Sequence, residues 1–311
     1  MTHASLRAGA VVVALALDRL FGEPPARLHP VAWMGKALGA SGAPWPRLAP
    51  RGQFLCGAAA WIAGGGVVLA AAALAVAMMR RLPLLPPWSV VAHVLILGIL
   101  LKPLLAWRML RDEVAGVESA LAEGIEAGRQ RLSRLVSRDT RRLNAAEVRE
   151  SALESLAENL NDSLVAPLLW FSLGGLPAAA LYRFANTADA MWGYRDRWEW
   201  AGKWAARADD VLSYVPARLT ALLLALTGRR SPRGLGAVAR VTPSPNGGWP
   251  MGMLALALGV RLRKPGVYAL NAEGLEPCAT DTERALGICG RAAWLAVAIS
   301  ATVLAALGWR W

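Results

Sequence analysis

Residues 154–167 read Glu-Ser-Leu-Ala-Glu-Asn-Leu-Asn-Asp-Ser-Leu-Val-Ala-Pro, and here a charged helix runs straight into apolar sequence. At about 100° per residue, the acids of this helix share roughly one quarter of its circumference: Glu147, Glu150, Glu154 and Glu158. In a soluble protein such a stripe is most often a solvated face. This stripe continues into Asn159, Asn161 and Asp162 and then meets sequence with no water to face, which makes it a candidate functional site.

Hydrophobic runs place the chain in a membrane. The chain has 311 residues, of which 55% are hydrophobic. The clearest spans are 54–79, 88–105 and 291–309, each near or above the roughly 20 residues that cross a bilayer, and weaker ones are 6–21, 163–182 and 211–226. We therefore expect an all-α polytopic integral membrane protein with about four to six membrane segments and helical cytoplasmic loops.

This protein is expected to form a single membrane-embedded domain over residues 1–311. Its parts would be 1–107 with the N-terminal spans and a His-Pro loop, 108–162 as a soluble helical segment, and 163–311 with motif-rich loops and the last spans. The start, 1–21, resembles a signal peptide, but no small-residue cleavage site precedes Asp18, so we expect it to be retained. The interfacial anchors would be Trp88, Trp107, Trp170, Trp192 and Trp309.

Charge and cysteine usage exclude several classes of partner. The net charge is +12, but the basic residues alternate with acids in loops and form no stripe with interleaved aromatics, so nucleic acid is not expected as a partner. Positive loops beside membrane spans explain the charge, and they are compatible with an anionic substrate. The three cysteines are far apart without CxxC spacing, which indicates neither a disulfide framework nor a zinc site.

Glycine and proline mark where helices break or approach one another. Pro167, Gly174, Gly175 and Pro177 interrupt 163–182, which predicts a broken or re-entrant segment lining a cavity. The run Gly64-Gly65-Gly66 would let another helix approach closely, while His93 in its apolar run is expected to pack in the core.

Local signals predict further boundaries. Residues 137–140, Ser-Arg-Asp-Thr, look like the start of the acidic helix, and residues 277–283 like the start of the last one. Residues 241–250 specify turns whose backbone amides suit an anion. Asp209 and Asp210 open a hydrophobic segment, either as helix caps worth about 1 kcal/mol or as site residues. The chain has no Walker loop, Rossmann turn, HExxH or GxSxG motif.

Six motifs in register resemble the CobD/CbiB family of cobalamin biosynthesis, from about residue 15 to residue 290. They are Gly-Glu-Pro at 22–24 with His-Pro-Val at 29–31, Ser-Arg-Asp-Thr at 137–140, Glu-Ser-Leu-Ala-Glu-Asn at 154–159 with Asp162, Asn-Thr-x-Asp-x-Met-x-Gly-Tyr at 186–194, Asp-Asp at 209–210 with Pro-Ala-Arg-Leu-Thr at 216–220, and Ser-Pro-Asn-Gly-Gly-Trp-Pro at 244–250. The chain departs from the family at 160–163, which usually reads Thr-Ser-Asp-Gly and here reads Leu-Asn-Asp-Ser, and at Trp192 and Trp204, where smaller residues are more familiar.

The resemblance implies an ATP-dependent and Mg²⁺-dependent ligase, adenosylcobinamide-phosphate synthase. It would join the free propionate of adenosylcobyric acid to the amine of aminopropanol or of its O-phosphate through an acyl phosphate. The implied catalytic residues are Glu154, Glu158 and Asp189, and the implied metal ligands are Asp162, Asp209 and Asp210, although any of these six acids suits Mg²⁺. The implied substrate-binding residues are His29, Asn159, Asn186, Arg195, Arg207, Arg218, Ser244, Asn246 and Trp249. The general base is either Glu158 or Asp189.

Two other function classes fit parts of the sequence. One is an AmpE-like membrane sensor without ligase activity, which has no evident need for so many acids next to the membrane. The other is a transporter, favoured by the broken segment and disfavoured by the long soluble loops. For the ligase we expect a multi-pass protein of the cell (inner) membrane with a cytoplasmic site that all polar motifs share. A homo-oligomer, or association with other late cobalamin-pathway enzymes, is left open.

Overall fold

The computed structural model describes residues 3–42, 45–83, 88–193 and 198–307. The chain forms two compact units. Unit 1 lies within Met1–Ala106, Ala166–Leu212 and Val297–Trp311, and unit 2 comprises Trp107–Val165 and Ser213–Ala296. The chain passes from one unit to the other after residues 106, 165, 212 and 296.

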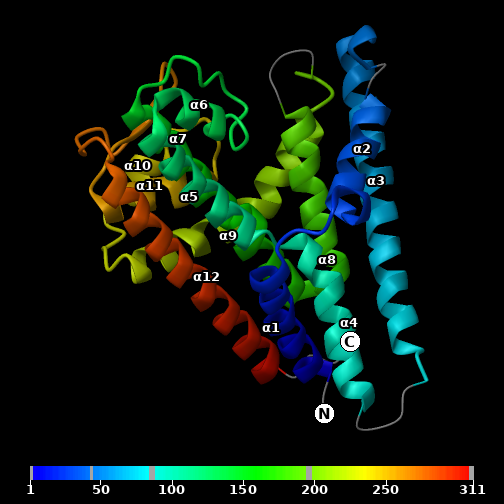
Figure 1. Ribbon diagram of the computed structural model, residues 1–311. Helices are drawn as coiled ribbons and strands as arrows, with labels where there is room; N and C mark the ends of the chain where they lie inside the picture. The colour runs from blue at the N-terminus through cyan, green and yellow to red at the C-terminus, as the bar shows by residue number, and fades with distance from the viewer. Residues whose placement is uncertain (1–2, 43–44, 84–87, 194–197, 308–311) are drawn as a thin grey trace. The chain divides into compact units, whose positions relative to one another are not determined.

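Unit 1 contains the first spans (Figure 1). Its elements are α1 (His3–Phe21), η1 (Ala26–Leu28), α2 (Pro30–Gly42), η2 (Trp45–Arg47), α3 (Pro50–Arg80), α4 (Trp88–Leu101), η3 (Lys102–Leu104) and α8 (Ala166–Trp192). Two long helices are divided between the units: α9 (Lys203–Thr227) and α12 (Ala279–Leu307).

Unit 2 contains shorter helices and one small hairpin. Its elements are α5 (Trp107–Glu123), α6 (Ile125–Leu132), α7 (Ala145–Leu160), η4 (Asn161–Val165), α10 (Leu235–Ala239), α11 (Gly248–Leu258), β1 (Leu262–Lys264) and β2 (Tyr268–Leu270). The strands pair antiparallel, with Leu262 opposite Leu270. Leu262 and Leu270 are both fully buried, so this side of the hairpin belongs to the core.

Among the described residues, five helical stretches are long and apolar enough to cross a membrane: Pro50–Arg80, Trp88–Glu123, Ala145–Trp192, Lys203–Thr227 and Ala279–Ala306. They confirm the expected all-α polytopic membrane protein. The first candidate, 6–21, forms helix α1 but is not among the five. The anchor Trp309 and the end of the expected span 291–309 lie outside the described residues.

Small residues set the packing of unit 1. A Cβ on Gly64 would lie 2.6 Å from Cζ of Phe184, so α3 and α8 approach as closely as the glycine run predicted. Helices α1 and α4 also lie side by side (Figure 1). Because Gly9 faces Val94 and Gly98 faces Val13, these two helices run parallel.

Helix α8 is broken as expected. Gly175 has φ 68° and ψ −160°, a conformation that glycine tolerates, and Pro177 follows it. Upstream, η4 is one turn of π-helix, a local widening of the helix that is often found at functional sites.

Three local expectations were wrong. The acidic helix begins at the cap residue Asn144, and not at 137–140, because Asn144 and Glu147 exchange backbone hydrogen bonds of 2.9 Å in a capping box. Of the two alternatives for Asp209 and Asp210, a cap at the helix start is excluded, since both lie inside α9, which begins at Lys203. Trp192 is only 1% exposed and Trp107 only 6% exposed, so neither is an interfacial anchor.

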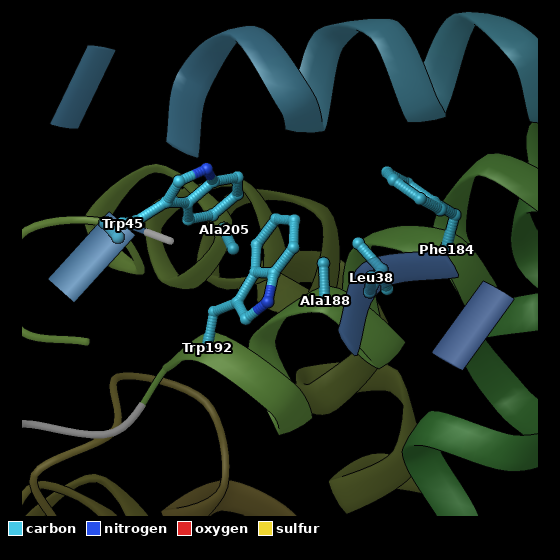
Figure 2. Close-up of a cluster of buried hydrophobic side chains, with 7 residues drawn as sticks. Leu38, Trp45, Phe184, Ala188, Trp192 and Ala205 are labelled. Atoms are coloured by element: carbon cyan, nitrogen blue, oxygen red, sulfur yellow. The ribbon is translucent and has the colours of Figure 1, made fainter. Parts of the chain in front are cut away.

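An aromatic cluster of unit 1 explains the burial of Trp192 (Figure 2). The ring centroids of Trp45 and Trp192 lie 4.8 Å apart in an edge-to-face arrangement, and Leu38, Phe184 and Ala188 pack around them. Such aromatic pairs stabilise the fold by about 0.5–1.5 kcal/mol, in addition to the free energy gained by burying their surface. The cluster fixes η2 and α2 against the C-terminal half of α8.

Candidate functional site

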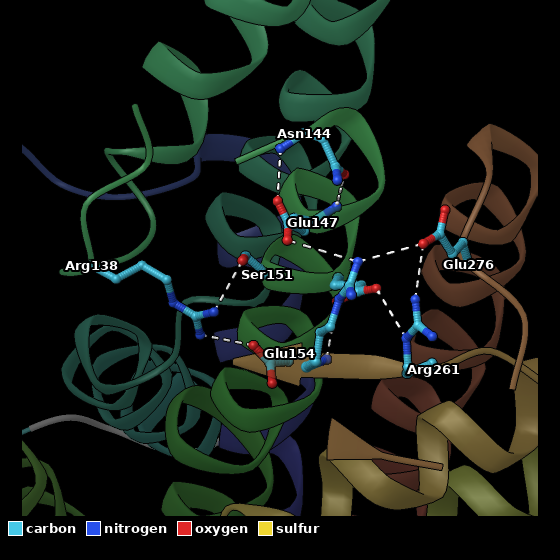
Figure 3. Close-up of polar contacts among 9 residues, drawn as sticks. Arg138, Asn144, Glu147, Ser151, Glu154, Arg261 and Glu276 are labelled. Carbon is cyan, nitrogen blue, oxygen red and sulfur yellow. Dashed lines mark hydrogen bonds and ion pairs between the residues drawn. The ribbon is translucent and has the colours of Figure 1, made fainter. Parts of the chain in front are cut away.

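Three acids of the α7 stripe, Glu147, Glu150 and Glu154, form ion pairs and do not make a solvated face (Figure 3). Arg263 of β1 donates to Glu150 from its Nε at 2.9 Å and from its backbone nitrogen at 3.2 Å. Arg261 lies 3.7 Å from the same carboxylate and 2.9 Å from Glu276. Glu150 is fully buried, so these arginines compensate a charge that would otherwise be costly.

One helical turn further, Glu154 pairs with a residue from the 133–144 connection. Arg138 donates to the Glu154 carboxylate at 2.8 Å and to Ser151 Oγ at 3.1 Å (Figure 3). Burial and then the negative charges of Glu154 and Glu158 raise the pKa of Tyr268. The phenol of Tyr268 therefore stays protonated beside these acids and is able to donate a hydrogen bond.

Glu158 faces the turn that precedes α11. A Cβ added to Gly247 would lie 2.9 Å from Oε1 of Glu158, so the turn backbone comes close to this carboxylate only because position 247 has no side chain. The acids of 154–158 and the turn of 244–250, which lie about 90 residues apart in sequence, thus form one site in unit 2.

Ser244 holds the shape of that turn. Its Oγ accepts hydrogen bonds from the backbone nitrogens of Asn246 at 3.2 Å and Gly247 at 3.1 Å. Thr242 donates to the carbonyl oxygen of Ser244 at 2.9 Å. Serine is suited to this role because its hydroxyl mimics a backbone turn. Ser244 is therefore a shaping residue of the site.

Arg218 connects α9 to the same turn. Its Nη1 donates to Asn246 Oδ1 at 2.7 Å and to the carbonyl oxygen of Tyr214 at 2.8 Å, and its Nη2 donates to the carbonyl oxygen of Pro245 at 3.2 Å. The guanidinium lies 4.7 Å from the ring centre of Trp249. These contacts orient a planar cation at the surface of the turn, as recognition of carboxylate or phosphate requires.

Asn159, Asn161 and Asp162, at the end of the acidic helix, make different hydrogen bonds. Asn161 donates to Asp162 at 2.8 Å, and Thr220 of α9 donates to Asn161 at 3.1 Å. Asn159 donates to the carbonyl oxygen of Ser155 in its own helix at 3.0 Å. The π-turn of η4 therefore gives Asp162 a fixed orientation through Asn161.

Unit 1 holds a second polar group, around His29. Its Nε2 lies 2.8 Å from Glu23, and Lys102 lies 2.8 Å from Glu23 and 3.1 Å from Asp18. Burial would raise the pKa of Glu23, but its hydrogen bonds and ion pairs with His29 and Lys102 hold it below the usual value. Nδ1 of His29 is buried and has no hydrogen-bond partner among the described residues, which suits contact with a ligand.

The other predicted residues of unit 1 lie on α8 and α9. Asn186 lies 3.4 Å from Asp209, so these two motifs meet. Asp189 lies against Gly193, where any side chain would overlap its carboxylate. Arg207 is exposed beside Trp198 and Lys203, while Asp210 is half-buried on the same helix. Arg195 lies outside the described residues.

The donor set fits Mg²⁺ held together with a nucleotide. In the part of the chain that the structure describes, no three carboxylate, histidine or cysteine side chains gather into a preformed metal cage. Mg²⁺ is commonly bound by one or two carboxylates, with phosphate oxygens and water completing the shell. Glu158 and Asp162, four residues apart on one helical stretch of unit 2, are such a pair. In unit 1, Asp209 and Asp210 are consecutive residues of α9 and do not face each other, and Asp209 lies beside Asn186.

Sequence reasoning missed several members of these groups. Arg138 and Glu23 lie inside two of the six motifs, at 137–140 and 22–24. Lys102 is a single lysine in an apolar run, and this pattern could have indicated a buried ion pair. Tyr268 and Arg263 had no signal, because their relation to α7 depends on the hairpin folding back onto that helix.

Comparison with known proteins identifies the family. The family described as "CobD/Cbib protein" matches residues 11–306, nearly the whole chain. This chain belongs to the CobD/CbiB family. The fold of unit 2 brings together its motifs at 137–140, 154–162, 216–220 and 244–250. No solved structure matches the chain.

Curated members of the CobD/CbiB family resemble the chain over most of their length. A protein of Methanothermobacter thermautotrophicus named "Probable cobalamin biosynthesis protein CobD" is 42% identical, over 89% of this chain and 90% of its own. Proteins named "Cobalamin biosynthesis protein CobD" are 38% identical in Rhodobacter capsulatus, over 92% of this chain and 93% of their own, and 37% identical in Brucella anthropi, over 86% and 88%.

Proposed function

We propose that this protein catalyses ATP-dependent amide formation in cobalamin biosynthesis. The acid would be the free propionate of adenosylcobyric acid, and the amine would be (R)-1-aminopropan-2-ol or its O-phosphate. The pathway is supported by the names of relatives that are similar along nearly the whole chain. The reaction class is supported by the chemistry of the residues.

The observation that carries the proposal is the approach of the turn at 244–247 to Glu158. It places a carboxylate beside backbone and side-chain groups that Arg218 and Ser244 hold in one orientation. A base and a fixed cation that contact the same turn suit a reaction in which an amine must lose a proton while an anionic acid is held in place. A sensor would not require this arrangement.

ATP would supply the phosphoryl group that activates the propionate, and Mg²⁺ would neutralise its charge. Within unit 2, Asp162 would be the ligand of the metal, and within unit 1 the candidate ligands are Asp209, which lies beside Asn186, and Asp210. Arg218 would bind the propionate or a phosphate, because its guanidinium presents a planar set of donors. Glu158 would take the proton of the attacking ammonium, with Asp189 as the alternative base.

Glu154 and Tyr268 would shape the surroundings of this base. Arg138 neutralises Glu154, so the negative charge beside Glu158 is partly compensated. Tyr268 stays protonated and would donate a hydrogen bond. His29, Asn159, Asn186, Arg207, Asn246 and Trp249 would contact the substrates.

The test uses the full chain purified in detergent, with adenosylcobyric acid, aminopropanol phosphate and Mg·ATP. We expect an amide product by mass spectrometry and stoichiometric ADP, and aminopropanol in parallel reactions identifies the preferred amine. Absence of both products under conditions in which a known family ligase turns over would contradict the proposal and favour a sensor.

Matched variants connect the activity to the site. Glu158→Gln removes the proposed base while keeping the size of the side chain, and we expect a loss of turnover of at least about 100-fold. Glu273→Gln is the control, because Glu273 is exposed in the same unit. Equal rates in the two variants would remove Glu158 from the site.

A further inference from the structure

A cavity of about 460 Å³ lies in unit 1, away from the groups described above. It is lined by the start of α1, the end of α3, the middle of α4 and the break in α8. Most of its wall is apolar, with Leu97, Phe171 and Pro177 among the lining residues. The two charged side chains in the wall are Arg7 and Arg80, and none of the described lining residues is acidic.

Arg7 is the more buried of these two cations. Its Nη1 is buried and has no hydrogen-bond partner among the described residues. A Cβ on Gly175 would lie 2.9 Å from Nη2 of Arg7, so the guanidinium fits against the break in α8 because position 175 is glycine. A buried guanidinium nitrogen without an acceptor is costly, which indicates that an anion completes this site.

The remaining polar group of the wall is His93, whose ring nitrogens face the backbone carbonyl oxygens of Ser89 and Met79. A neutral imidazole donates to one of the two. His93 of α4 thus lies against the end of α3 and is half-buried in the wall of the cavity, rather than packed in the core as expected. Arg80 adjoins this junction and is exposed, so the positive charge of the cavity can be reached from outside the protein.

The cavity lies at one end of the unit 1 spans. Helices α1 and α4 run parallel; Asp18 lies near the C-terminal end of α1 and meets Lys102, which directly follows α4. Arg7, in the second turn of α1, is therefore at the opposite end from the group around His29. Two arginines over an apolar wall at the end of membrane helices match the surface of a phospholipid, with its phosphate next to its acyl chains.

We infer that Arg7 and Arg80 bind the phosphate group of an anionic ligand in this cavity, with its apolar part against Phe171 and Leu97. A phospholipid of the surrounding bilayer supplies this chemistry, and a free phosphate supplies its head alone. The guanidinium groups would bind the phosphate oxygens by charge-assisted hydrogen bonds. This inference does not depend on the proposed ligase activity.

The test is native mass spectrometry of the delipidated full chain in detergent. Phosphatidylglycerol is one ligand, zwitterionic phosphatidylcholine is the second, and inorganic phosphate at the same ionic strength is the third. We expect retained adducts with phosphatidylglycerol and at least about tenfold fewer with phosphatidylcholine. Arg80→Gln and Arg7→Gln should each lower the affinity for phosphatidylglycerol by about tenfold or more.

Arg81→Gln is the matched control, because it removes the neighbouring exposed cation, which does not line the cavity. Binding of inorganic phosphate that depends on Arg80, without lipid adducts, would identify a free anion as the ligand. Adducts unchanged in Arg7→Gln and Arg80→Gln, or no binding of either anion, would overturn the inference. Circular dichroism of each variant shows whether it is folded, and Arg80→Gln alters only an exposed side chain.

Discussion

Gly247 lies so close to Glu158 that a Cβ at position 247 would stand 2.9 Å from the carboxylate oxygen Oε1. The φ of Gly247 is −56°, so alanine is permitted by the backbone there, and only the neighbouring side chain must move. A substitution at position 247 should therefore change the geometry of the site without straining the backbone of the turn.

Gly247→Ala should lower turnover by about tenfold or more while leaving the protein folded, because the methyl group displaces the proposed base. Steady-state rates and thermal unfolding of the same preparation measure both effects. The control is Gly236→Ala, since a Cβ at position 236 meets nothing within 4 Å. An unchanged rate in Gly247→Ala would show that the position of this carboxylate does not matter.

Arg218→Lys should lower kcat/KM by about ten- to 100-fold, because lysine keeps the charge but loses the planar set of donors to Asn246 and Pro245. The control is Arg233→Lys, an exposed position in unit 2. Kinetics with varied corrinoid and with varied ATP identify which substrate Arg218 binds. Equal kcat/KM values for Arg218→Lys and the wild type would remove this residue from the binding group.

Arg138→Met should cost about 3–5 kcal/mol in the free energy of unfolding, because the Glu154 side chain is only 3% exposed and would keep a buried, unpaired charge. The double variant Arg138→Met/Glu154→Met should recover most of this loss, since both charges leave together. Denaturant unfolding in detergent measures all three proteins. A double variant less stable than Arg138→Met would contradict the pairing.

Gly57→Ala should destabilise unit 1 by about 1–3 kcal/mol or more, because a methyl group there would overlap the oxygen of Ala201, and the contacted atom belongs to the backbone rather than to a flexible side chain. Gly66→Ala, on the same helix, meets nothing within 4 Å and should be neutral or slightly stabilising. Thermal unfolding of the pair in one detergent is the measurement. Equal midpoints would show that the segment near Ala201 does not pack on α3.

Glu23 should contribute stability that depends on pH. Its pKa in the folded protein is lowered from 4.5, so the folded state favours the charged form. The contribution is complete above the unfolded value near 4.5 and is lost as the pH falls through the lower folded pKa. The stability difference between the wild type and Glu23→Gln should therefore shrink as the pH falls below 4.5. A difference that does not shrink below that pH would contradict the ion pairs of Glu23.

The sequence predicted the parts of the structure that depend on local pattern. Hydropathy identified the spans that begin near 54 and 88, and glycine and proline located the break in α8 at Gly175. Helical spacing placed Glu150, Glu154 and Glu158 on one face. The start of α7 was misplaced because two capping signals lie a few residues apart, and only the one at Asn144 closes its hydrogen bonds.

Local sequence patterns could not predict two sets of long-range ion pairs. Glu150 and Glu154 look alike in the sequence, yet folding pairs the first with the β-hairpin and the second with Arg138. Lys102 looks like an exception in an apolar run until α1 brings Asp18 beside it.

By itself, the sequence determined the membrane class, the helices and the residues of the six motifs, because hydropathy and periodicity act between near neighbours along the chain. Only the tertiary structure decided which acids are neutralised, which carboxylate meets the turn at Gly247, and where Arg7 has a nitrogen without an acceptor. The physical reason is that burial and charge compensation depend on segments far apart in the chain, whose approach no local spacing encodes.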